Sequence, residues 1–247
     1  MKKLFLIAAT STALLTSATS FADVGQFYLK AEGGAAMLNK EKAKLPKLPK
    51  EMENLSLTQK VKRSAVGVVG LGAGYYAMDN VRAELTLDFL PNIEFKDSIT
   101  VAGAVAKGEG KLQGTLESKR KGQVISLLLS GYVDLYDAGF AKFFAGAGVG
   151  MAQIKEKATL NGSVVGTHNT IEVARIPVNV SLKSKSSNNF AYQLSVGASA
   201  NVADGINVEL AYSWRDYGAA KYGKGKESKS ESAYRGHHLM AGLRFDI

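Results

Sequence analysis

Ten residues near the C-terminus decide the fold: His238-Leu239-Met240-Ala241-Gly242-Leu243-Arg244-Phe245-Asp246-Ile247. The odd-numbered positions are Leu, Ala, Leu, Phe and Ile, and the even-numbered positions are His, Met, Gly, Arg and Asp. Successive side chains of a β-strand point to opposite faces. The segment therefore predicts a strand with one apolar face and one polar or small face.

The same period of two recurs along the chain, whereas a helical period of 3.6 is almost absent. Three other segments alternate clearly: Val81–Phe89, Phe190–Val202 and Ile206–Arg215. Four alternate more weakly: Gln26–Met37, Ser64–Tyr76, Gln123–Tyr136 and Phe140–Ala152. The weaker segments are about 11 to 14 residues long, close to the roughly 9–11 residues with which a tilted strand crosses a bilayer. We predict eight strands.

The connections between these strands alternate strictly between short and long. Three are short and turn-like: Ala77–Asn80, Asp137–Gly139 and Ala203–Gly205. Four are long and polar: Leu38–Arg63, Leu90–Gly122, Gln153–Asn189 and Tyr217–Arg235. In an up-and-down barrel this order places every long loop at one rim, as in outer-membrane barrels with short periplasmic turns and long extracellular loops. We therefore predict an all-β fold, an eight-stranded antiparallel transmembrane barrel.

In a soluble ligand-binding barrel, polar and apolar side chains also alternate along each strand. Other residues must therefore decide whether the apolar face points outward to lipid or inward. The apolar face carries aromatic residues near strand ends, as the two membrane interfaces favour: Phe89, Tyr192, Tyr212, Trp214 and Phe245. The other face carries Gly, Ser and charges of both signs, which can pair inside a narrow lumen. The predicted lumen charge network is Lys30, Glu32, Arg82, Glu84, Glu209 and Arg244, with Asp88, Asp134, Lys142 and Arg215 on the same face.

The N-terminal segment has the pattern of a secretory signal. Lys2-Lys3 is followed by an apolar run over residues 4–15 and by the small-x-small site Ser20-Phe21-Ala22. A transmembrane helix needs about 20 apolar residues, and polar residues from Thr10 onward interrupt the run too early. We predict a cleaved signal over residues 1–22 and a barrel domain over residues 23–247. Export makes a nucleic-acid partner unexpected.

The net charge of +9 is unevenly distributed. The four long connections hold 24 basic and 11 acidic residues, whereas the predicted signal holds two lysines and no acid. One rim is therefore cationic, and it could bind lipopolysaccharide or acidic host partners such as sulfated glycans. The candidate partner-binding residues are Lys40, Lys42, Lys44, Lys47, Lys50, Lys221, Lys224, Lys226, Lys229 and Tyr222.

Residues for catalysis or metal binding are scarce. The chain has no cysteine and three histidines. His237 and His238 are adjacent and would point to opposite faces of a strand, so they could not chelate one metal. Glycine runs such as Gly70-x-Gly72-x-Gly74 open no helix, so a phosphate loop lacks its context, and we expect them to make room for bulky lumen side chains. We predict no enzyme activity, metal or cofactor.

The C-terminal residues also resemble a family signal. Gly242, Phe245 and Ile247 fit the pattern by which the barrel insertion machinery recognises outer-membrane barrels, although Phe is the commoner last residue. Over its length the chain resembles the OmpA/OmpX-like, opacity-type eight-stranded surface proteins, and more closely the putative adhesins of rickettsiae. The residues that carry this resemblance are Met1-Lys2-Lys3, Tyr28–Met37, Asn39–Lys42, Gly72–Tyr76 and Val81–Leu87.

The resemblance implies attachment to host-cell surface proteins and capture of serum proteins such as vitronectin. It carries over no individual binding residue. The function predicted is a bacterial outer-membrane surface adhesin with cationic extracellular loops. A small channel and an envelope-stabilising barrel are the alternatives. A barrel of about eight strands is just wide enough for side chains to fill it, which favours a plugged lumen over a pore.

Overall fold

The structure is a computed structural model that describes residues 24–39, 56–61, 64–104, 110–168, 171–183, 186–222 and 230–247. The predicted signal, residues 1–22, lies outside these ranges. Ten strands are present in the described part: β1 (Phe27–Asn39), β2 (Ser56–Val61), β3 (Ser64–Met78), β4 (Val81–Ala104), β5 (Gly110–Asp137), β6 (Lys142–His168), β7 (Ile171–Lys183), β8 (Ser187–Ala203), β9 (Ile206–Tyr222) and β10 (Ser230–Asp246). The described residues include no helix long and apolar enough to cross a membrane.

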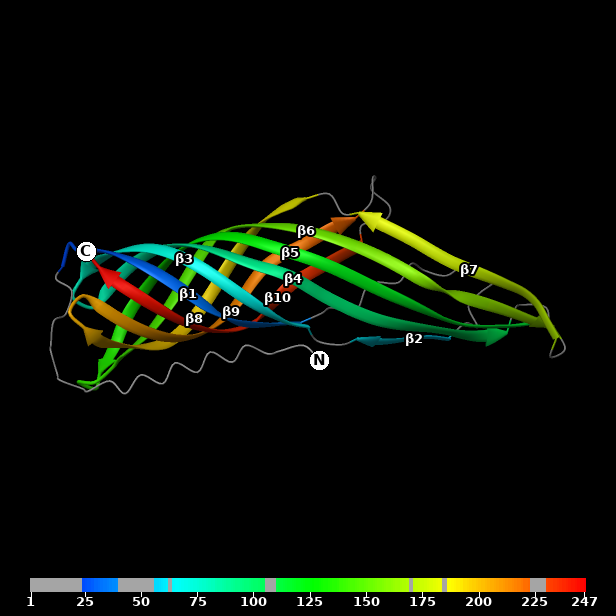
Figure 1. The fold of residues 1–247 in the computed structure, drawn as a ribbon, viewed down its shortest axis with the longest axis horizontal. Helices are drawn as coiled ribbons and strands as arrows, with labels where there is room; N and C mark the ends of the chain where they lie inside the picture. Colours follow the sequence, from blue (N-terminus) through cyan, green and yellow to red (C-terminus); the bar gives the residue numbers. More distant parts are fainter. Residues whose placement is uncertain are drawn as a thin grey trace.

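Eight of the strands close into a ring (Figure 1). The order is β1-β3-β4-β5-β6-β8-β9-β10, and β10 pairs with β1 to complete it. All of these pairings are antiparallel. The prediction of an eight-stranded antiparallel up-and-down barrel is confirmed. Closure matters physically because an open sheet would leave backbone N–H and C=O groups unpaired in lipid.

Tight turns and long connections lie at opposite ends of the ring. The tight turns join β3 to β4, β5 to β6 and β8 to β9. Gly139 and Gly205 in two of them have φ of 84° and 66°, a left-handed conformation that glycine adopts without a Cβ clash. The C-terminus lies at the same end as these turns (Figure 1).

Two predicted loops are mostly β-sheet, so their predicted extents are wrong. The segment Leu90–Gly122 contains the continuation of β4 and the start of β5, which pair from Ile93↔Gly122 to Ala104↔Lys111. The segment Gln153–Asn189 contains the continuation of β6, all of β7 and the start of β8. β7 pairs with β6, so these two strands form a hairpin within the predicted loop. β2 lies in the first long connection and pairs with β4.

These strand extensions form one sheet that projects beyond the ring (Figure 1). Its order is β2-β4-β5-β6-β7. We call this part the β-extension, and it comprises β2, residues 93–104 of β4, residues 110–122 of β5, residues 156–168 of β6, and β7. The barrel thus continues into a rigid paired structure on the side opposite the tight turns.

A β-bulge marks the start of the β-extension in β4. Leu90 pairs with Val124 and Ile93 pairs with Gly122, so β4 has one more residue than β5 between these two pairs. Asn92 accommodates the extra residue with φ of 53°, and Pro91 costs no ladder hydrogen bond at a bulge. Because one residue is added, Leu90 and Ile93 both face inward and both are fully buried. The bulge keeps the inner face continuous where the barrel becomes the β-extension.

The outer wall of the ring is apolar. Leu29, Leu71, Leu87, Leu129 and Leu243 are among the large apolar side chains that remain exposed on it. Aromatic pairs lie toward both ends of this band: Phe27–Tyr75 and Tyr136–Phe143 near the tight turns, and Phe190–Tyr192, Tyr192–Trp214 and Tyr212–His237 near the long connections. An apolar band between two aromatic girdles is the lipid-facing surface of a membrane barrel.

Candidate functional site

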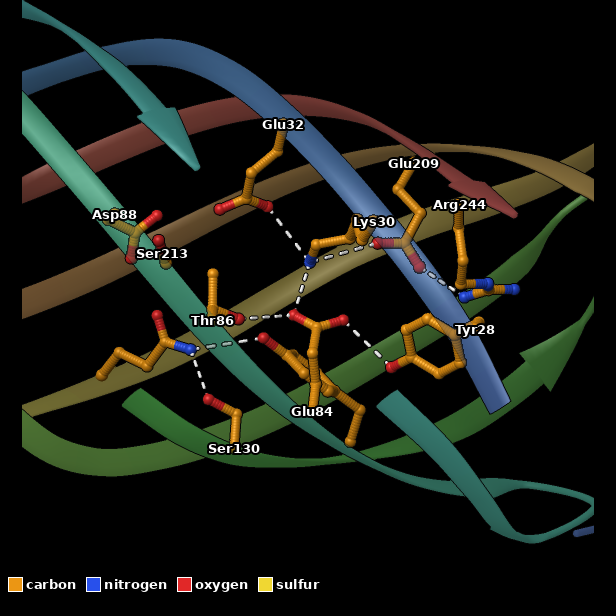
Figure 2. Close-up of polar contacts among 12 residues, drawn as sticks. Tyr28, Lys30, Glu32, Glu84, Thr86, Asp88, Ser130, Glu209, Ser213 and Arg244 are labelled. Carbon is orange, nitrogen blue, oxygen red and sulfur yellow. Dashed lines mark hydrogen bonds and ion pairs between the residues drawn. The ribbon is translucent and has the colours of Figure 1, made fainter. Parts of the chain in front are cut away.

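The charged residues predicted for the lumen meet inside the ring (Figure 2). Lys30 of β1 lies at their centre, and its Nζ is 2.6 Å from Oε1 of Glu84, 3.1 Å from Oε2 of Glu32 and 3.6 Å from Oε2 of Glu209. The Tyr28 hydroxyl donates to Glu84 at 3.0 Å, and the Thr86 hydroxyl donates to the same carboxylate at 2.9 Å. These side chains come from three strands that alternation alone placed on one face.

Glu209 of β9 gathers three cations. Besides Lys30, its Oε1 accepts from Arg82 Nη2 at 3.1 Å and from Arg244 Nη1 at 2.5 Å. The Arg82 guanidinium also lies 4.5 Å from the Phe144 ring centroid, a cation–π distance. All six predicted network residues therefore lie in one connected cluster, and their side chains are at most 6% exposed.

A neighbouring pair extends this cluster toward the long connections. Arg215 of β9 donates from Nη1 to Asp88 at 2.7 Å and from Nη2 to Glu32 at 3.5 Å. Four buried cations thus face four buried carboxylates: Lys30, Arg82, Arg215 and Arg244 against Glu32, Glu84, Asp88 and Glu209. Asp134 and Asp246 add one carboxylate each, 2.7 Å from Arg82 and 3.6 Å from Arg244. Contacts between opposite charges offset part of the cost of burying them.

An apolar layer fills the lumen above this network, on the side of the long connections. Its members are buried and come from all eight strands of the ring: Ala36, Leu38, Val66, Val68, Leu90, Ile93, Phe95, Val124, Leu128, Ala152, Ile154, Ala191, Tyr217, Tyr234 and Met240. This layer was not predicted, because the alternating segments indicated a polar inner face throughout. The signal was present in β1, where Leu38 is in phase with Lys30 at intervals of two. The interior therefore has a charged lower half and a hydrophobic upper half.

A second polar cluster lies at the base of the β-extension. Arg120 of β5 is 3.7 Å from Asp97 and 3.7 Å from Glu156, and the Tyr234 hydroxyl donates to Glu156 at 2.6 Å. Arg120 also lies 5.7 Å from the Phe95 ring centroid. These positions fall in the predicted loops, so this cluster was not predicted from the sequence. The cluster ties β10 to the inner face of the β-extension.

The predicted partner-binding residues lie mostly outside the described ranges. This holds for Lys40, Lys42, Lys44, Lys47, Lys50, Lys224, Lys226 and Lys229. Lys221 and Tyr222 are the last two residues of β9, where the backbone pairs with Glu231 and Ser230. The proposed insertion signal lies at the other end: Gly242 and Phe245 belong to β10, and Ile247 follows it. Phe245 and Ile247 are exposed on the outer wall.

The two adjacent histidines point away from each other. His237 is exposed, and its Nδ1 is 2.6 Å from the Tyr212 hydroxyl. His238 is buried, with Nε2 3.5 Å from the Tyr217 hydroxyl. Within the described ranges, no group of three His, Cys, Asp or Glu side chains is placed to hold a metal ion.

A closed ring with an aromatic-edged apolar wall and a buried charged interior is a small outer-membrane β-barrel. The chain matches the family described as outer membrane protein beta-barrel domain over residues 6–245, and it belongs to that family. It is located in the bacterial outer membrane.

Its relatives place it among rickettsial surface proteins. The chain is 39% identical over 275 residues to a putative adhesin of Rickettsia conorii, and the match covers 100% of both chains. It is 38% identical over 255 residues to a putative adhesin of Rickettsia bellii, again over 100% of both. The solved structure of OprG from Pseudomonas aeruginosa is similar over 92% of this chain and 97% of that chain, with 15% identity and a TM-score of 0.43. The protein is an adhesin-like outer-membrane barrel.

Proposed function

We propose that the protein is a non-enzymatic adhesin that binds host-cell surface or serum proteins through its cationic long connections. In this proposal the barrel is the anchor, and the β-extension holds the connections away from the bilayer. Outer-membrane barrels expose their long loops to the outside and their tight turns to the periplasm. The relatives' name supports binding as the function, although it identifies no partner for this chain.

The observation that carries the proposal is the filled interior. Lys30, Arg82 and Glu209 are buried in the lower half of the lumen, and Leu90, Ile93 and Phe95 are buried in the upper half. Side chains occupy the space that a transported solute would need. The long-connection end is therefore the part of the molecule best suited to an external partner, and its excess of basic residues favours acidic surfaces.

Neutralising the first and fourth connections is expected to weaken adhesion about tenfold or more, because charge pairs at an interface each contribute binding free energy. The variant carries Gln at Lys40, Lys42, Lys44, Lys47, Lys50, Lys221, Lys224, Lys226 and Lys229. Binding of the folded barrel, displayed on vesicles, to host cells and to immobilised serum proteins measures the effect. Equal binding by the variant and the unmodified protein would show that the cationic-connection mechanism is wrong.

The filled lumen also gives a test against the channel alternative. We expect single barrels in a planar bilayer to show no steady current above the leak of the lipid. Buried side chains fill both the charged and the apolar layer, and an eight-stranded barrel has room for little beyond its own side chains. Planar-bilayer recording at several voltages measures this. A sustained conductance on the order of a nanosiemens would instead support a water-filled pore.

A further inference from the structure

Five lysines form a patch on the outer face of the sheet, where the barrel becomes the β-extension. They are Lys96 of β4, Lys119 and Lys121 of β5, and Lys155 and Lys157 of β6, and we call them the lysine patch. All five side chains are exposed. Their strands are direct neighbours, with Lys96 opposite Lys119 and Lys121 opposite Lys157 in the strand register. Two acidic residues, Glu94 and Glu117, lie on the same face, so the patch stays cationic.

The lysine patch continues the lipid-facing wall. On β5 the outward positions run from the exposed Ile125 through Gln123 to Lys121, and on β6 they run from the exposed Met151 through Gln153 to Lys155. Four residues advance about 13 Å along a strand, or about 10 Å across the membrane at the usual tilt of 35–45°. The polar zone of one leaflet is about 5–8 Å thick, and lysine side chains can reach back toward it. The ammonium groups of Lys121 and Lys155 can therefore reach the lipid headgroups.

Among the described residues of this face five lysines outnumber two acids, although Glu94 is the cross-strand neighbour of Lys121 on β4. Glu94 contacts Lys119 at 2.9 Å and Lys96 at 3.6 Å. The hydrogen bond from Lys119 and the positive charges of Lys119, Lys96 and Lys121 lower the pKa of Glu94 below its usual value. Lys121 and Lys157, however, are direct cross-strand partners, and like charges in that position destabilise a sheet. An anion between them would remove this repulsion.

We propose that the lysine patch binds the phosphate groups of lipid headgroups in the outer leaflet, with the phosphates of lipid A as its occupant. Three observations support this ligand: the patch is on the same face as the apolar band, its side chains can reach the headgroups, and an anion would relieve the repulsion between the cross-strand lysines Lys121 and Lys157. A lipid whose acyl chains lie along Ile125 and Met151 would present its phosphates to Lys121, Lys155 and Lys157. These lysines therefore differ in role from those of the first and fourth connections, which we assign to external partners.

The test uses the folded protein in neutral detergent, titrated with diphosphoryl lipid A and with lipid A stripped of its phosphates. Native mass spectrometry counts the bound lipid. We expect the unmodified protein to prefer the phosphorylated form by about tenfold or more, since each lysine near an anionic leaflet contributes attraction. The variant with Gln at Lys96, Lys119, Lys121, Lys155 and Lys157 is expected to lose this preference to within about twofold.

A matched control removes five charges elsewhere, with Gln at Lys40, Lys42, Lys44, Lys47 and Lys50, and it should keep the preference. A heat-dependent shift in gel mobility verifies that each barrel is folded. If the five-residue variant fails to fold, the pair Lys121→Gln and Lys157→Gln replaces it, with a loss of about threefold expected. An unchanged lipid preference in the folded patch variant would overturn the proposal. Binding of a heparin fragment is measured on the same variants. If the patch variant lost heparin-fragment binding but kept its lipid preference, the proposal would also be overturned, because the patch would then be a site for soluble glycans. Neither result bears on host-cell binding by the other connections.

Discussion

Replacing Glu209 with Ala is expected to lower the free energy of unfolding by about 3–5 kcal/mol, the cost of breaking a buried ion pair by removing one partner. The Glu209 carboxylate contacts Lys30, Arg82 and Arg244 at 3.6, 3.1 and 2.5 Å. Its removal takes one carboxylate partner from each of these three buried cations. Lys30 and Arg82 keep one or more other partners, so the cluster would be weakened as a whole rather than emptied.

Urea unfolding of the barrel in lipid vesicles, followed by Trp214 fluorescence, measures this change. Glu117→Ala is the matched control, because Glu117 is exposed on the outer face of β5 and its loss should change stability by about 0.5 kcal/mol or less. The isosteric Glu209→Gln removes the charge and keeps the shape, so an intermediate loss is expected. If Glu209→Ala and Glu117→Ala proved equally stable, the lumen network would have no structural role.

Replacing Gly74 with Ala is expected to destabilise the barrel by about 1–3 kcal/mol, the usual cost of overpacking. A Cβ at Gly74 would overlap the ring of Tyr28, which is held by its hydrogen bond to Glu84 and by a tilted ring contact with Tyr76. The ring cannot move away without disturbing this network. The structure thus confirms that glycines at alternate positions make room for bulky lumen residues, and Gly146 beside Tyr132 repeats the arrangement.

The control is Gly131→Ala, on a neighbouring part of the same barrel. A Cβ there meets no atom within 4 Å, so the change in stability should be within about 0.5 kcal/mol. The urea unfolding midpoints of the two variants in lipid vesicles make the comparison. A Gly74→Ala barrel as stable as Gly131→Ala would mean that Tyr28 has a second favourable position in the lumen.

Local alternation was sufficient to predict the barrel. A period of two specifies which side chains share a face, so Lys30, Glu84 and Glu209 could be assigned to one interior although they are far apart in sequence. The distances between these side chains could not be predicted, because they depend on strand stagger, the shift of neighbouring strands along one another. Stagger is set by long-range hydrogen bonding and not by local composition.

The β-extension was missed because its entry looks like a loop. Pro91-Asn92 follows an alternating strand, and Pro followed by Asn suits the two central positions of a turn. In the structure it forms a bulge within a continuous strand, so the phase of alternation slips by one residue. A scan for strict alternation therefore ends at Phe89. The apolar upper layer was missed for a related reason: Leu90, Ile93 and Phe95 lie beyond that point and were assigned to the loop.

The pairing of β1 with β10 has a consequence for biogenesis. These strands are neighbours in the ring but lie at opposite ends of the described sequence, with Tyr28 opposite Asp246. A nascent chain lacking β10 has two unpaired edges, on β1 and on β9, and such edges attract other strands. The barrel can seal only after synthesis of its final strand, so insertion must follow translation and the waiting chain needs protection from aggregation. A factor that binds Phe245 and Ile247 would hold β10, the strand that completes the ring.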